Sequence, residues 1–221
     1  MSLSLSLSPV TLKLATSLDG RIATGTGESR WITGPEARAE VHRLRARHDA
    51  ILIGIGTALA DDPDLTVRSP AFAGVQPVRI VLDSQQRISR RSRLVETAGE
   101  VPTWIMTARE PDPELTAAGV VVCSCRVQAD GQLDLAHVME FIIKAGLHSV
   151  FVEGGGQVAA SFLKAGLVDA LEWFRAPVIL GQEGMPAIGA MALANLADAP
   201  RLKRVSVSAV GDDVWERYER G

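Results

Sequence analysis

The sequence predicts an α/β fold with a mixed, mostly parallel sheet and an antiparallel C-terminal hairpin. Continuous apolar runs, such as residues 50–55, are typical of strands that helices cover on both faces. Apolar stripes at helical spacing alternate with several of these runs, which is the pattern of β-α-β units. Near the C-terminus, two strand patterns flank Gly211 and Asp212 with no helix between them, which predicts the hairpin.

Local signals place the elements of the first half. The alternating residues 10–17 predict a strand that ends at a turn signal, Asp19 and Gly20. Pro35 suits the first turn of a helix that runs to about Arg47, and the arginines of this helix fall late, where the helix dipole favours them. Further strands are predicted at 50–55, 78–82, 103–106 and 120–123.

The second half continues the alternation. Apolar residues at helical spacing from Leu135 to Ile143 predict a helix that Gly146 ends. A strand at 150–153 and a second striped helix that ends at Gly166 follow. The last strands are predicted at 171–175, 204–210 and 214–218. A flexible surface loop is predicted at 68–76.

Length and composition predict an N-terminal tail at 1–9 and a single domain at 10–221. The net charge of −3 and the pI of about 5.8 argue against a general nucleic-acid or membrane binder. No window approaches the length of a membrane span, and the tail does not resemble a signal peptide. Cys123 and Cys125 are interpreted as buried reduced thiols of a cytoplasmic protein. The histidines lack metal-binding spacing, so no metal site is predicted.

The most informative segment is 152–159, which contains a strand end, a carboxylate, three glycines and a helix start. Glycines let the backbone approach an anion, and the N–H groups of a helix start point at it. The spacing also satisfies the G-x-G-x-x-A form of the dinucleotide fingerprint. Glu153 would then lie beside the phosphates of a nucleotide cofactor. A tight turn that binds no ligand is the alternative.

Two further groups suit a nucleotide site. Trp31 precedes the helix that Pro35 starts, and an indole can stack on a planar ring, although packing against the helix explains it equally well. Asp61 and Asp62 close the turn after the strand at 50–55, at the edge where ligands bind open α/β sheets. We interpret Asp61 as functional and Asp62 as support for the turn.

Isolated basic residues indicate phosphate binding. Arg45 and Arg68 lie near these turns, and Arg binds phosphate through two hydrogen bonds, although most exposed arginines are simply solvated. Ser84 and Arg87 follow the strand at 78–82, where Ser and Arg favour the 2′-phosphate of NADPH over the ribose diol of NADH. No P-loop and no G-x-S-x-G elbow occurs in the sequence.

Four segments together resemble the reductase domain of riboflavin biosynthesis, a domain often fused to a deaminase. They are VTLKLATSLDGRIA (10–23), GESRWIT (27–33), IGIGTALADDPDLTVR (53–68) and VEGGG (152–156), in the family's order. The resemblance implies a three-layer, dihydrofolate-reductase-like fold and a homodimer. It also implies NADPH-dependent reduction of the ribosyl group of 5-amino-6-(5-phosphoribosylamino)uracil to ribityl. The family's deaminase motifs are missing, so a separate deaminase is expected.

The resemblance also implies roles for individual residues. The NADPH site would contain Ala15, Trp31, Thr57, Asp61, Ser84, Gly154, Gly155, Gly156 and Gln157. Arg87 is added to this site because it follows the strand at 78–82, and not because of the resemblance. The substrate site would contain Ser29, Arg45, Leu65, Arg68 and Glu153, with the arginines facing the 5′-phosphate. Asp61 and Glu153 are the candidate catalytic carboxylates, which would orient the ribose or relay a proton.

Other functions remain open at this point. The same scaffold could reduce the non-deaminated pyrimidine or a pterin such as dihydrofolate, although a pterin would give Arg68 no phosphate to bind. A non-catalytic nucleotide-binding domain would bind NADPH without turning over any pyrimidine. The presence of both Asp61 and Glu153 argues against this last reading.

Overall fold

The computed structural model describes residues 10–221, so the tail predicted at 1–9 lies outside it. The strands of the described chain are β1 (Val10–Thr16), β2 (Arg21–Ala23), β3 (Ala50–Gly54), β4 (Val78–Leu82), β5 (Thr103–Thr107), β6 (Val121–Ser124), β7 (Val150–Gly154), β8 (Ala170–Arg175), β9 (Met185–Pro186), β10 (Leu202–Val210) and β11 (Asp213–Arg220). Its helices are α1 (Pro35–Arg45), α2 (Ile55–Asp61), α3 (Arg93–Glu96), α4 (Pro113–Ala117), α5 (Leu135–Lys144), α6 (Gly156–Lys164) and a 3₁₀ turn at Leu196–Asp198.

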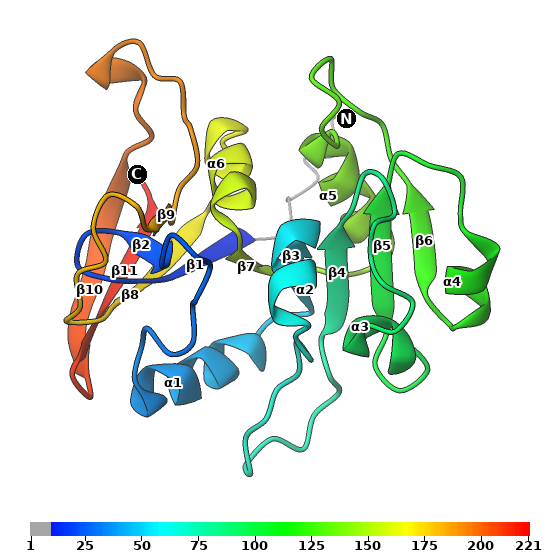
Figure 1. The fold of residues 1–221 in the computed structure, drawn as a ribbon, viewed down its shortest axis with the longest axis horizontal. Helices are drawn as coiled ribbons and strands as arrows, with labels where there is room; N and C mark the ends of the chain where they lie inside the picture. The colour runs from blue at the N-terminus through cyan, green and yellow to red at the C-terminus, as the bar shows by residue number, and fades with distance from the viewer. Residues whose placement is uncertain (1–9) are drawn as a thin grey trace, which may run out of the picture.

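Nine of these strands form one sheet in the order β10-β11-β8-β1-β7-β3-β4-β5-β6 (Figure 1). Within the run β8-β1-β7-β3-β4-β5-β6, all neighbouring strands are parallel. β11 pairs antiparallel with β8, and β10 pairs antiparallel with β11. The two short strands β2 and β9 pair separately. The predicted α/β fold, with a mostly parallel sheet and an antiparallel C-terminal hairpin, is confirmed.

Helices cover both faces of the sheet, which gives three layers. On one face, α5 and α6 pack over strand residues that include Leu52. On the other face, α2, α3 and α4 pack over Ile51 and Ile53, while α1 packs against Phe151 and Phe174. Successive residues of β3 therefore point into different layers, which explains why this strand reads as a continuous apolar run.

The segment after β3 differs from the prediction. The sequence predicts a strand to residue 55 and then a turn, but residues Ile55–Asp61 form the helix α2. Glycine and β-branched residues are poor helix formers, and the burial of Ile55 and Ala58 in the core outweighs that preference here. The helices α3 and α4 and the strands β2 and β9 are also missed, because each has five residues or fewer and shows no period.

Three smaller features concern the end of α1, the two cysteines and the loop at 68–76. Helix α1 ends at Arg45, two residues before the predicted end. Cys123 and Cys125 are buried and form no disulfide, as predicted, and burial raises the pKa of Cys123 to about 12. The loop predicted at 68–76 contains no helix or strand, and the Gln76 side chain joins its ends by two hydrogen bonds to the backbone of Val67.

Candidate active site

A cleft of about 1530 Å³ opens at the carboxyl ends of the central parallel strands. Ligands of open α/β sheets bind at this edge, and pockets for drug-sized molecules measure roughly 300–1,000 Å³. The cleft therefore has room for a cofactor and a substrate together. Its lining includes every residue predicted for the two sites: Ala15, Ser29, Trp31, Arg45, Thr57, Asp61, Leu65, Arg68, Ser84, Arg87, Glu153, Gly154, Gly155, Gly156 and Gln157.

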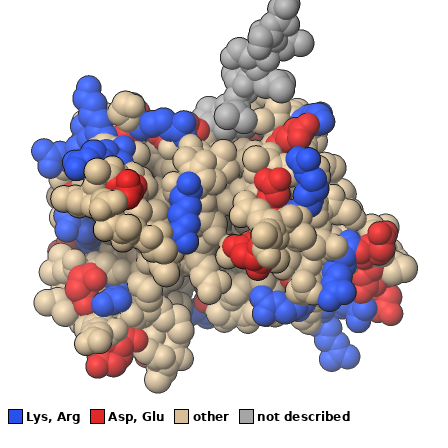
Figure 2. All heavy atoms as spheres, turned by 90° about the horizontal axis from the view of Figure 1, so that it is seen from above, with Lys and Arg blue, Asp and Glu red and all other residues tan. Residues whose placement is uncertain are grey.

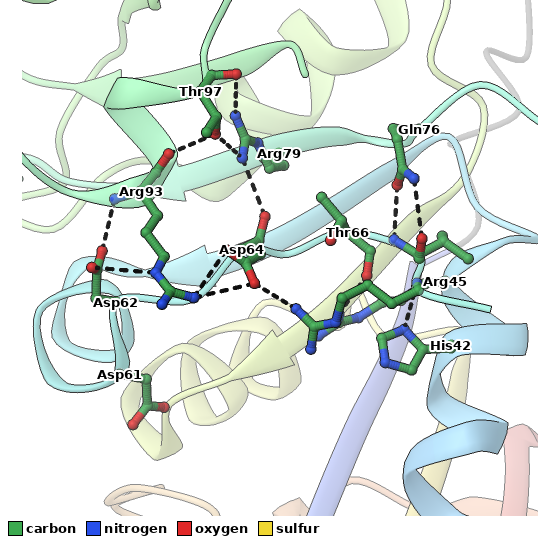
Figure 3. Close-up of polar contacts among 12 residues, drawn as sticks. His42, Arg45, Asp61, Asp62, Asp64, Thr66, Gln76, Arg79, Arg93 and Thr97 are labelled. Atoms are coloured by element: carbon green, nitrogen blue, oxygen red, sulfur yellow. Dashed lines mark hydrogen bonds and ion pairs between the residues drawn. The ribbon is translucent and has the colours of Figure 1, made fainter. Parts of the chain in front are cut away.

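Arg45 and Glu153 form a buried ion pair in the wall of this cleft. Arg45 lies at the end of α1 and donates two hydrogen bonds to the Glu153 carboxylate, from Nε to Oε1 and from Nη2 to Oε2 (2.9 Å). The side chains are only 11% and 8% exposed. Burial alone would lower the pKa of Arg45, but the charge of Glu153 raises it, so the guanidinium stays charged. Nη1 of Arg45 also donates to the carbonyl oxygen of Thr66 (2.9 Å), which fixes the next loop against the pair (Figure 3).

Lys13 is a third charged group at this point. β1 and β7 are parallel with Leu12 opposite Val152, which brings the next residues, Lys13 and Glu153, side by side. Burial lowers the pKa of Lys13, the charge of Glu153 partly offsets this effect, and Arg45 lowers the pKa further. Lys13 therefore releases a proton more readily than an ordinary lysine does. The site combines a fixed cation, a carboxylate and a cation that can titrate.

The three glycines after Glu153 have different structural reasons. Gly154 and Gly155 have φ of 137° and 74°, which side chains other than hydrogen rarely allow. A Cβ at Gly156 would lie 2.4 Å from the carbonyl oxygen of Pro186, so this glycine is required by the packing of α6 against β9. The first two glycines shape the turn, and the third lets the start of α6 approach β9 closely.

Trp31 lies on the surface of the cleft and not in the core. Its side chain is 71% exposed, and the guanidinium of Arg38 lies 4.4 Å from the ring centroid. This exposure excludes a core tryptophan, whereas the contact with Arg38 of α1 is one that packing against the helix also predicts. A solvated indole in a cleft offers a flat surface for a planar ring.

The two adjacent aspartates after β3 differ in their contacts, and only Asp62 is joined to Arg93 in Figure 3. Asp61 lines the cleft, and its Oδ1 lies 3.5 Å from the hydroxyl of Ser29. Asp62 has φ of 39° and its Oδ1 accepts a hydrogen bond from the backbone N–H of Arg93 (2.9 Å). Asp62 therefore supports the turn, as the sequence suggested, and both aspartates line the cleft.

Ser84 and Arg87 line the cleft just after β4. The preceding Asp83 is fully buried and accepts a hydrogen bond from the backbone N–H of Ile88 (2.9 Å), which holds this turn in place. The exposed side chain of Arg87 makes no hydrogen bond or ion pair with any other residue in 10–221. Its five N–H donors are therefore available to an anion.

Leu65 and Arg68 lie on the loop that follows α2. Leu65 is 3% exposed and has φ of 49°, so a buried side chain is held on a strained backbone. The backbone N–H of Arg68 donates to Nδ1 of His42 (3.1 Å), and its Nη1 donates to Oδ2 of Asp64 (2.6 Å). Burial, together with the charges of Arg45 and Arg68, lowers the pKa of His42, so the ring stays neutral and can accept.

Residues 9–215 match the protein family described as the RibD C-terminal domain. The chain belongs to this family. The resemblance inferred from four sequence segments is confirmed, and the fold is the dihydrofolate-reductase-like fold of this family of riboflavin biosynthesis reductases.

Relatives of this RibD C-terminal domain fall into two groups. The riboflavin biosynthesis protein RibD of Bacillus amyloliquefaciens is 38% identical over 210 residues, which cover 93% of this chain and 55% of that protein. Acinetobacter baumannii RibD superposes with a TM-score of 0.87 at 30% identity, over 99% of this chain and 59% of the other. The 2,5-diamino-6-ribosylamino-4(3H)-pyrimidinone 5′-phosphate reductase of Methanothermobacter thermautotrophicus is 38% identical, over 95% of this chain and 96% of that protein. The chain thus spans little more than half of the RibD relatives.

Charged and apolar residues of the RibD-type domain form neither a one-sign patch on the face shown in Figure 2 nor a membrane-length helix in residues 10–221. On the face shown in Figure 2, acidic and basic side chains are interspersed among other residues. In the described residues, no helix is long and apolar enough to cross a membrane. Over the same range, no three His, Cys, Asp or Glu side chains gather as metal ligands would.

Among the polar residues that line the cleft of this RibD-type domain, sequence reasoning did not single out Lys13, His42 and Asp64, and it treated Arg93 only as one of several arginines after the strand at 78–82 that favour NADPH. For Lys13 a signal existed, because a lysine stands between Leu12 and Leu14 in a strand pattern. His42 and Asp64 had no signal of their own, and only the folded chain brings α1, the loop after α2 and α3 to one cleft.

Proposed function

We propose that this chain reduces the ribosyl group of 5-amino-6-(5-phosphoribosylamino)uracil to ribityl, with NADPH as the reductant. One observation carries the proposal: the charged cluster of Lys13, Arg45 and Glu153 shares a single cleft with the glycine turn at the start of α6. Hydride transfer needs a reductant and an acceptor carbon held in near-attack geometry. A cleft with room for both supports this chemistry, and a phosphorylated sugar gives Arg68 a ligand.

The residues present fit a dinucleotide phosphate cofactor. Gly154 and Gly155 open the backbone at a helix start, where N–H groups favour an anion. A Cβ on Gly155 would lie 3.2 Å from Oγ1 of Thr57, so the turn and α2 leave little space for a side chain. Arg87 is available for a 2′-phosphate, and the exposed ring of Trp31 suits a planar group. We therefore assign the turn, Thr57, Ala15, Ser84, Asp61 and Gln157 to the NADPH site.

NADPH, when bound, supplies the hydride for C1′ of the ribosyl group. In the net reduction, the bond from C1′ to the ring oxygen breaks, and this oxygen takes up a proton to become a hydroxyl. Lys13 is the best-placed donor, because the strand register puts it beside Glu153 and burial lowers its pKa. Arg45 and Lys13 keep the pKa of Glu153 low despite the burial that would raise it, and the ionised carboxylate in turn stabilises the Lys13 ammonium. Ser29 and Asp61 would orient the ribose hydroxyls.

The pyrimidine before deamination is a second candidate substrate. The Methanothermobacter reductase is named for that compound and is as similar to this chain as the Bacillus RibD is. Both compounds carry the phosphate, so Arg68 suits either. We favour the deaminated compound because RibD proteins are prominent among the relatives, and a deaminase would then have to act before this enzyme.

Removal of the Arg68 charge tests the assignment of the substrate phosphate. We expect Arg68→Ala to raise the KM for the phosphorylated pyrimidine by about 10- to 100-fold, as the loss of charged hydrogen bonds implies. The affinity for NADPH, measured by fluorescence titration, should stay within about twofold, because the proposed cofactor residues lie elsewhere in the cleft. An equal loss of both affinities would refute the assignment of Arg68 to the substrate.

A further inference from the structure

A single carboxylate joins two arginines of the cleft. Oδ2 of Asp64 accepts from Nη1 of Arg68 at 2.6 Å, and Nη1 of Arg93 lies 3.1 Å from Oδ1 and 3.3 Å from Oδ2. Figure 3 shows Arg93 reaching across to Asp64 from the neighbouring segment. The Arg68 and Arg93 side chains are 56% and 60% exposed, and all three residues line the cleft. Two guanidinium groups from separate segments are thus held within reach of one small anion.

The buried Arg79 holds together the two backbone segments that carry these arginines. This residue is only 1% exposed, and its Nη1 donates to the carbonyl oxygen of Asp64 (3.2 Å) and to the hydroxyl of Thr97 (2.8 Å). Nη2 donates to the carbonyl oxygens of Leu94, Thr97 and Val101, at 3.2, 3.1 and 2.8 Å. Since α3 begins at Arg93 and contains Leu94, Arg79 clamps the Asp64 loop to the helix that carries Arg93 (Figure 3).

A second tie holds the same two segments together. The carboxylate of Asp62 accepts a hydrogen bond from the backbone N–H of Arg93 (2.9 Å) and lies 4.0 Å from Nε of that residue. Asp62 is half exposed, so water weakens this longer ion pair. The backbone on both sides of the arginine pair is therefore fixed, while the guanidinium groups themselves remain accessible.

The net charge of the site explains why one arginine is not enough to bind a phosphate dianion. Arg68 paired with Asp64 has no net charge, so this pair alone attracts a phosphate dianion poorly. A second guanidinium restores a positive charge and adds N–H donors for the three terminal oxygens of a phosphate monoester. We infer that Arg93 is a second ligand of the substrate's 5′-phosphate, and that Asp64 positions Arg93 beside Arg68. This inference rests on the proposed function for the identity of the phosphorylated substrate.

The test measures phosphate binding separately from catalysis. Ribose 5-phosphate is titrated calorimetrically into the wild type and the Arg68→Ala, Arg93→Ala and Arg91→Ala variants, with ribose as the control ligand. Arg91 is the matched control, because it is exposed, lies two residues away and is not part of the cleft lining. We expect Arg93→Ala to weaken ribose 5-phosphate binding by about 10-fold or more, since charged hydrogen bonds are lost, with Arg91→Ala unchanged. Binding to Arg93→Ala as tight as to the wild type would overturn the inference.

Steady-state kinetics give the second readout. For the phosphorylated pyrimidine, Arg93→Ala and Asp64→Asn should raise KM with little change in kcat, and Arg93→Lys should recover part of the loss. For the dephosphorylated ribosylaminopyrimidine, the same variants should behave like the wild type. Equal losses on both compounds, or a loss of NADPH affinity, would contradict a role at the phosphate. A wild type that binds ribose 5-phosphate through Arg93 but turns over neither compound would refute only the proposed function.

Discussion

Three charged side chains share a small volume at the carboxyl ends of β1 and β7. Arg45 and Glu153 hold each other by two hydrogen bonds, and Lys13 lies beside the same carboxylate. The group contains two cations and one anion. Lys13 is the cation that loses its proton most readily, because burial and the fixed charge of Arg45 both lower its pKa. This arrangement suits a group that must give up a proton during each turnover.

The Lys13 ammonium should therefore be essential for the proton step. We expect Lys13→Met to lower kcat by about 100-fold or more, the usual contribution of a positioned proton donor, with NADPH affinity unchanged. In the wild type, activity should fall as the pH rises through the lowered pKa of Lys13, because the ammonium form is then lost. Lys13→Arg should also lower kcat strongly, because a guanidinium keeps the positive charge but does not release a proton. A Lys13→Met variant with wild-type kcat and pH profile would exclude Lys13 as the donor.

The Arg45–Glu153 pair should also contribute to folding stability. Glu153→Gln leaves a buried guanidinium without its counter-charge, which should lower the free energy of unfolding by about 3 kcal/mol. Glu140→Gln is the matched control, because Glu140 forms an exposed ion pair with Lys144, and its loss should cost less than about 0.5 kcal/mol. Urea unfolding measures both values. Similar values for the two variants would mean that the buried pair is not a structural requirement.

At the scale of elements, the connection from β7 to α6 depends on close backbone contact. Gly156 faces the carbonyl oxygen of Pro186 in β9, and the backbone N–H of Gly189 donates to the carbonyl oxygen of Gly156 (2.7 Å). The start of α6 is thus fixed against the β9 segment, which belongs to a different part of the chain. The position of the helix start, and with it the proposed phosphate site, depends on this contact.

Two glycine-to-alanine substitutions should change the free energy of unfolding in opposite directions. Gly156→Ala places a Cβ 2.4 Å from a backbone oxygen, so α6 or β9 must move, and we expect a loss of about 1–3 kcal/mol, as for overpacking elsewhere. Gly56→Ala, within α2, meets no atom within 4 Å and should stabilise the protein by about 0.4–1 kcal/mol. Thermal unfolding of both variants checks the pair. A stabilising Gly156→Ala would show that the contact with Pro186 is not tight.

Sequence reasoning recovered the elements whose signals are long and regular. The strand β3 and the helix α5 were predicted within one or two residues, because their apolar patterns are set by burial along the whole element. It failed for α2, where buried contacts outweigh poor helix propensity. In the site, residues in sequence motifs were predictable, whereas Asp64 and Arg93 meet only in the folded chain, where Arg79 in β4 and Asp62 hold their segments together.

At the scale of the whole molecule, the two edges of the large sheet differ. β10 is a nine-residue edge strand whose residues are mostly exposed, including Val205 and Val207, each 51% exposed (Figure 1). β6, at the opposite edge, has only four residues. A long exposed edge strand with apolar side chains is a surface that proteins normally cover. The homodimer expected from the family resemblance would cover it.

A charge on β10 tests this expectation. We expect the wild type to be a dimer by light scattering, and Val207→Lys to shift it to monomer, because a buried lysine at the interface would be left unpaired. Val121→Lys, on the β6 edge and at a side chain 46% exposed, is the control and should remain dimeric. A wild-type monomer, or a Val207→Lys variant that stays dimeric, would place the interface elsewhere or remove it.

The most direct test of the central claim follows the oxidation of NADPH by its near-ultraviolet absorbance. Three compounds are compared: 5-amino-6-(5-phosphoribosylamino)uracil generated in situ by a deaminase, the non-deaminated pyrimidine, and dihydrofolate. The proposed function predicts rapid turnover of the first compound and little turnover of the other two. Turnover of the non-deaminated pyrimidine or of dihydrofolate alone would contradict the proposed substrate. NADPH binding without turnover of any of the three would contradict catalysis and favour a nucleotide-binding role.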